Sequence, residues 1–82
     1  MLKGFIVYTS EDAAYDELAG LDDFRNRNLH PEHNGDIDLV RYEKRGNAIH
    51  FESENGEALN YVMGFASETE DNVRMKSMEG SV

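Results

Sequence analysis

The sequence predicts an α+β fold, a two-layer sandwich in which an antiparallel sheet carries one or two helices on one face. Three observations lead to this prediction. Residues 2–9 are rich in the β-branched and aromatic side chains that strands favour, and residues 11–24 repeat apolar side chains at helical spacing. Two more strand candidates, residues 37–43 and 48–53, follow each other closely enough to form a hairpin.

The first strand, residues 2–9, is apolar on both alternating faces, which predicts a central strand covered on both sides, or at least a strand in mid-sheet. A helix from about residue 11 to 24 should follow, because Ser10 is a candidate cap and acidic residues fill the first turn. Gly20 is a candidate break in this helix. The apolar stripe of the helix comprises Ala13, Ala14, Leu18, Leu21 and Phe24, and the opposite side carries Asp12, Asp16 and Asp23.

Residues 25–36 have no apolar periodicity and collect Asn, Pro and Gly, so we expect a loop there. The strands 37–43 and 48–53 should then be joined by residues 44–47. The Gly-Asn pair of that connection suits a tight primed turn.

The segment after Asn55-Gly56 fits two structures. As a hairpin turn, Asn-Gly would start a strand that alternates Leu59, Tyr61, Met63 and Phe65 on one face. As a helix entry, it would place Ala58, Tyr61, Val62 and Phe65 on one buried stripe. Periodicity leaves both open, and the tail 72–76 reads as a final edge strand in either case.

The helix alternative produces the order βαββαβ, which is the split pattern of ferredoxin-like folds. The strand alternative produces β-α followed by an antiparallel meander. Both are two-layer α+β sandwiches, and a fold shared by so many activities indicates little about function.

Composition limits the class of protein. With 82 residues we expect a single domain, 1–82, with a frayed C-terminus from about residue 78. No cysteine is present, which excludes disulfides and cysteine-based metal sites. The apolar runs 4–8 and 61–66 are too short to cross a bilayer, and no basic-then-apolar leader occurs, so we expect a soluble, cytoplasmic protein.

The stretch HPEHNGDID, residues 30–38, is the densest group of potential metal ligands. His30 and His33 are three residues apart, a spacing that would aim both imidazoles at one ion on a helix. Pro31 opposes that geometry, because it disfavours helical backbone at the residue before it. The carboxylates available to complete a site are Glu32, Asp36 and Asp38. A turn explains these residues without an ion, so we predict no metal site and keep metal binding as the least favoured alternative.

Catalytic patterns are weak. No serine occupies a glycine-flanked elbow, and no glycine-rich phosphate loop occurs. His50 lies in a predicted strand, where a histidine is commonly a packing residue. The carboxylate pairs Asp22-Asp23 and Glu52/Glu54 would need a pocket that so small a domain has little volume to form. We therefore expect neither enzymatic activity nor a cofactor.

The strongest functional signal is negative charge. Seventeen acidic residues against eight basic ones give a net charge of −9, which should repel nucleic acid and anionic membranes and favour cationic surfaces. The acids recur in three groups in separate predicted elements, and no lysine is interleaved between residues 4 and 43. The groups are Asp12, Asp16 and Asp23; Glu52, Glu54 and Glu57; and Glu68, Glu70 and Asp71.

An array of fixed carboxylates can compete with phosphates for a basic groove on another protein. Small, acidic, cysteine-free inhibitors of nucleic-acid enzymes are familiar among phage-encoded proteins, and this chain is similar to them in composition and size. We therefore expect a non-catalytic protein that binds a basic protein surface, as an inhibitor or DNA mimic. A solubilising acidic surface without a partner would have the same composition. The alternative function is an assembly module that forms a homodimer or a subunit contact near Val73 and Met75.

Overall fold

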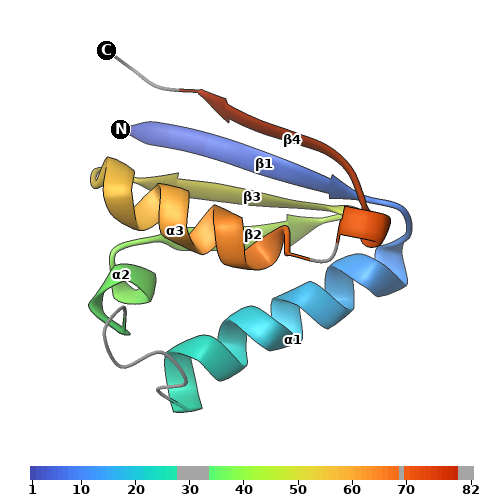
Figure 1. Cartoon of the computed structure of the whole chain (residues 1–82), viewed down its shortest axis with the longest axis horizontal. Helices are drawn as coiled ribbons and strands as arrows, with labels where there is room; N and C mark the ends of the chain where they lie inside the picture. Colours follow the sequence, from blue (N-terminus) through green and yellow to red (C-terminus); the bar gives the residue numbers. More distant parts are fainter. Residues whose placement is uncertain (28–33, 69, 80–82) are drawn as a thin grey trace.

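The computed structural model describes residues 1–27, 34–68 and 70–79 of the chain. Its elements confirm the α+β prediction and the antiparallel sheet with helices packed on it (Figure 1). In chain order they are β1 (Leu2–Tyr8), α1 (Glu11–Arg27), α2 (Asn34–Asp38), β2 (Arg41–Arg45), β3 (Ala48–Ser53), α3 (Gly56–Ala66), the 3₁₀ turn η2 (Glu70–Asn72) and β4 (Val73–Glu79).

The four strands form one sheet in the order β2-β3-β1-β4, and every neighbouring pair is antiparallel. β1 lies between β3 and β4. The connection from β1 to β2 contains α1, and the connection from β3 to β4 contains α3. Each of them joins two strands that lie two positions apart in the sheet. This is the split βαββαβ order expected for a helix after Asn55. The strand interpretation of residues 56–66 is wrong, because that segment is the helix α3.

Both long helices pack against the same face of the sheet (Figure 1). Along β1 the residues Gly4, Ile6 and Tyr8 are buried toward the helices, whereas the intervening Phe5 and Val7 are only half-buried on the other face. None of the described helices covers that other face. The prediction of a strand in mid-sheet is therefore confirmed, whereas full cover on both faces is wrong, and the apolar residues of the uncovered face lie on a surface.

The close fit between β1 and α3 depends on one glycine. A Cβ atom added at Gly4 would collide with the thioether of Met63, which is fully buried, and would lie 3.0 Å from the carbonyl oxygen of Ser77 on β4. Any larger residue would require the Met63 side chain to shift within a packed core, whereas glycine fits without rearrangement.

α1 is longer and more continuous than expected. It passes through Gly20 without a break and ends at Arg27 rather than near residue 24. Ser10 acts as the expected cap, since the Ala13 amide donates to its Oγ at 3.1 Å. The predicted stripe packs as expected, with Leu18 half-buried and its other members buried, namely Ala13, Ala14, Leu21 and Phe24.

The predictions for residues 25–43 need three corrections. Residues 25–27 belong to α1, and residues 34–38 form the short helix α2 rather than loop and strand. β2 begins at Arg41, four residues later than expected, and extends to Arg45. The predicted loop residues 28–33 lie outside the described part of the chain.

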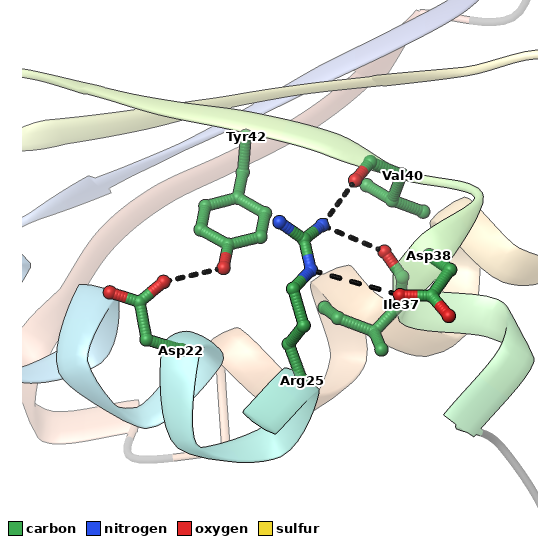
Figure 2. A network of polar contacts seen from close by, with 6 residues as sticks. All are labelled: Asp22, Arg25, Ile37, Asp38, Val40 and Tyr42. Atoms are coloured by element: carbon green, nitrogen blue, oxygen red, sulfur yellow. Dashed lines mark hydrogen bonds and ion pairs between the residues drawn. The ribbon is translucent and has the colours of Figure 1, made fainter.

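A polar network attaches the end of α1 to the connection between α2 and β2 (Figure 2). The Arg25 guanidinium donates to the carbonyl oxygens of Ile37, at 3.1 Å, and Val40, at 3.2 Å, and stacks over the Tyr42 ring. The Tyr42 hydroxyl donates to Asp22 at 2.6 Å. Burial, followed by that hydrogen bond, raises the pKa of Tyr42 to about 12. Asp22 is therefore occupied in joining α1 to β2.

The hairpin and the last helix begin as their turn residues predict. Gly46 has a left-handed backbone with φ of 62°, which suits the tight primed turn between β2 and β3. Asn55 caps α3, and its side-chain oxygen accepts from the Ala58 amide at 3.0 Å.

β4 begins one residue later than the predicted tail strand and continues to Glu79. In the described part of the chain, no helix is both long enough and apolar enough to cross a membrane.

Candidate functional site

The end of β1, the start of α1 and the end of α3 meet at one end of the molecule, where η2 also lies (Figure 1). The buried Tyr8 hydroxyl donates to the carbonyl oxygen of Ala66, the last residue of α3, at 2.7 Å. The Thr9 amide donates to the carbonyl oxygen of Asn72 at 2.8 Å, which holds η2 beside the first turn of α1. These two hydrogen bonds bring together segments that are more than fifty residues apart in sequence.

The negative charges of Glu68 and Asp16 act on the Glu17 carboxyl at this end, and we call these three residues the Glu17 cluster. Glu17 is half-buried and the other two are exposed. Burial raises the pKa of Glu17, and the negative charges of Glu68 and then Asp16 raise it further. All three causes therefore oppose ionisation of the Glu17 carboxyl.

No cation of the described residues neutralises this cluster. None of the ion pairs found among these residues involves Asp16, Glu17 or Glu68. Lys76 reaches the same end of the molecule, but its ammonium donates to the Ser67 hydroxyl, at 3.1 Å. By contrast, Glu11 on the same helix contacts the Lys44 ammonium at 3.6 Å.

Two other predicted site residues flank the Glu17 cluster. Asp12 is exposed on α1, one turn before Asp16 and on the same side of the helix. Asp71 is exposed in η2, next to the start of α1. The side chain of Glu70 lies outside what the structure describes. The first and third predicted groups therefore adjoin each other in space at Asp12, Asp16, Glu68 and Asp71.

The other predicted site residues lie elsewhere. Asp23 is near the far end of α1 and pairs with Arg27 at 3.5 Å. Glu52 is on the sheet face that the helices leave uncovered and pairs with Arg41 at 3.9 Å. Glu54 and Glu57 are exposed where α3 begins, at the opposite end of the molecule from the Glu17 cluster (Figure 1). The nine predicted residues thus do not form one continuous surface.

Glu17 is the residue that sequence reasoning missed, although a signal was present. It lies four residues after Ala13 and four before Leu21, so it continues the apolar stripe of the helix. A carboxylate in a buried stripe should be partly desolvated, as Glu17 is. Its approach to Glu68 depends on how α1 and α3 pack, and no local pattern shows that.

Some of the metal and catalytic candidates lie within the described residues and others do not. His30 and His33 lie outside the described residues, and the remainder contains no group of three or more His, Asp or Glu side chains placed to hold a metal ion. His50 is half-buried on β3, where its ring packs against Phe5 with the centroids 5.8 Å apart. Packing of this kind is the role expected for an isolated strand histidine.

Comparison with known proteins adds no relative from which a role could be inferred. No protein-family model, no curated protein and no solved structure matches the chain. A functional proposal therefore depends on the geometry and electrostatics described above.

Proposed function

We propose that this chain is a non-catalytic protein of the cytoplasm that binds a basic surface of a partner protein through the Glu17 cluster, with Asp12 and Asp71 at its margins. Where that basic surface is a nucleic-acid-binding groove, the protein would occupy it as a mimic of the phosphate backbone and act as an inhibitor. Small acidic inhibitors encoded by phages work in this manner, and a viral source would fit the proposal.

One arrangement supports the proposal above the others, namely the half-buried Glu17 carboxyl on which the like charges of Glu68 and Asp16 act, which raises its pKa. An ionised carboxylate beside two like charges is stabilised by any cation that approaches it. An arginine or lysine of a partner would supply that cation, and partial burial would make the attraction stronger than at a fully exposed site. A merely solubilising surface has no need to gather like charges around a desolvated group.

The same physics predicts how binding should depend on salt. Exposed charges interact over a screening length of about 8 Å at physiological ionic strength and about 3 Å in 1 M salt. A complex held by the Glu17 cluster should therefore form quickly at low salt and weaken steeply as salt is added.

The experiment is affinity capture from the source cell with three immobilised proteins. The first is the wild type, and the second is Asp16→Asn/Glu68→Gln, which removes two exposed charges from the cluster. The third is Glu54→Gln/Glu57→Gln, which removes two exposed charges from the opposite end of the molecule. We expect the wild type and the third protein to retain the same basic partner at low salt, and the second protein to lose it.

Three outcomes would overturn the proposal. One is a partner retained equally by the wild type and the Asp16→Asn/Glu68→Gln variant. Another is a partner whose retention does not change between low salt and roughly 1 M salt, where surface attraction is screened. Loss of binding only in the Glu54→Gln/Glu57→Gln variant would also contradict it, because the binding surface would then lie at the other end.

A further inference from the structure

The sheet face that faces away from α1 and α3 has an apolar centre. Strand register places Phe5 and Val7 of β1 on this face, with Ala48 of β3 and Met75 of β4 directly opposite Val7 on either side. Phe5 and Val7 are half-buried, and Met75 is 51% exposed. These four side chains are contiguous across three strands, which distinguishes them from an isolated surface methionine.

Charged side chains surround this apolar centre, and their signs are mixed. The register assigns to the face the basic Lys3, Arg41 and Arg45 and the acidic Glu43 and Glu52. Two pairs form within the face, since Arg45 contacts Glu43 at 2.9 Å and Arg41 contacts Glu52 at 3.9 Å. An apolar centre within a polar rim is the anatomy of a protein–protein interface.

The charge of this face contrasts with that of the whole chain. Its three basic and two acidic described side chains leave it near neutral, whereas the chain carries −9. Two copies of so acidic a protein repel each other through most approaches. Approach through this face brings together the least acidic sides of the two molecules, with the carboxylates of α1 pointing away.

We propose that the uncovered sheet face is the interface of a homodimer, with Phe5, Val7 and Met75 at its centre. A second copy presents the same near-neutral rim and apolar centre, so the contact is self-complementary under twofold symmetry. A strongly basic partner gains little at this face, because its carboxylates Glu43 and Glu52 are already paired with Arg45 and Arg41. The dimer would expose two Glu17 clusters on its outer sides, and it requires no other partner.

The size of the face indicates a dissociable dimer. Four strands spaced about 4.8 Å apart and about six residues long cover roughly 19 Å by 20 Å. This footprint of about 380 Å² is roughly half of the 800 Å² or so that each partner buries in a standard stable interface, so the contact is a weak one. The dimer should therefore form at high protein concentration and dissociate on dilution.

The test is analytical ultracentrifugation of the full chain from about 1 μM to about 1 mM, the range over which a micromolar dissociation constant is visible. We expect a monomer–dimer equilibrium that persists in high salt, because its centre is apolar. The variant Met75→Glu should raise the dissociation constant at least tenfold. Leu39→Glu is the matched control, since Leu39 is 52% exposed outside this face and the substitution adds the same charge.

Circular dichroism and thermal unfolding should show that both variants remain folded, as expected for exposed positions. A monomer at every concentration would overturn the proposal. So would a dimer that Met75→Glu leaves intact, or one that Leu39→Glu disrupts to the same degree. Neither result bears on partner capture by the Glu17 cluster, so the two proposals fail independently.

Discussion

Gly4 is the residue at which an added side chain would force the core to shift. An added Cβ would collide with the Met63 thioether, with the Met63 methyl group 2.8 Å away and the Ser77 carbonyl oxygen 3.0 Å away. We expect Gly4→Ala to lower the free energy of unfolding by about 1–3 kcal/mol, as overpacking of a fitted core does. Urea denaturation measures the change.

Gly64 provides the matched control within α3. A Cβ there meets nothing within 4 Å, and alanine favours a helix interior over glycine by about 1 kcal/mol. Gly64→Ala should therefore raise the free energy of unfolding by up to that amount. If Gly4→Ala proved as stable as the wild type, the close packing of β1 against α3 would be wrong.

Glu17 should make stability depend on pH in an unusual direction. Its pKa is raised in the folded protein, chiefly by burial, so the folded state holds its proton more tightly than the unfolded chain. This group therefore contributes stability that is present below the ordinary glutamate pKa of about 4.3 and lost as pH rises through the folded value. Ionisation of Glu17 in the folded protein is therefore destabilising.

The variant Glu17→Gln removes that cost. It should be more stable than the wild type at pH 7, and its advantage should shrink as pH falls below the raised pKa of Glu17. Thermal unfolding of both proteins across this pH range gives the comparison. A variant that was less stable than the wild type at pH 7 would show that Glu17 is neutralised in a way the structure does not contain.

At the scale of single elements, α3 depends on its cap. The Asn55 side chain accepts from the Ala58 amide at 3.0 Å, which satisfies one of the free amides at the helix start. Asn55→Ala should cost about 1 kcal/mol of stability. Asn60→Ala, an exposed substitution in the middle of the same helix, should cost nothing, and equal losses at both positions would argue against the cap.

The caps were also the most informative local features of the sequence. Ser10 predicted the start of α1, and Gly46 with Asn47 predicted the hairpin turn. Asn55-Gly56 fitted both a cap and a turn, because the apolar residues after it satisfy the strand and helix periods equally. The choice is made by tertiary structure, since α3 buries Ala58, Leu59, Val62, Met63 and Ala66 against the sheet.

Residues 37–40 illustrate what a local pattern cannot show. Ile37 and Val40 read as the beginning of a strand, yet Ile37 lies in α2 and Val40 lies just before β2. Both are buried in the core, and both carbonyl oxygens accept from Arg25, twelve and fifteen residues earlier (Figure 2). A side chain from α1 therefore stabilises a backbone shape that strand propensity does not predict.

At the scale of the whole molecule, charge is distributed unevenly. The Glu17 cluster lies where α1, α3 and η2 meet, and the near-neutral face lies across the sheet from both long helices. Sequence reasoning identified four of the acidic residues at this end, because excess charge is visible in composition and on a helical wheel. It missed Glu17, and it included carboxylates that lie far from this end of the molecule. Both errors arise because proximity between elements depends on the packing of α1 against α3.

The pKa of Glu17 provides the most direct test of the proposed acidic binding site. Its side-chain carboxyl can be titrated by NMR in the free protein and again with an excess of an arginine-rich peptide. We predict a pKa above the ordinary glutamate value in the free protein and a clear decrease with the peptide, because a bound cation favours the ionised form. An ordinary pKa in the free protein, or a raised one that the peptide leaves unchanged, would contradict the account.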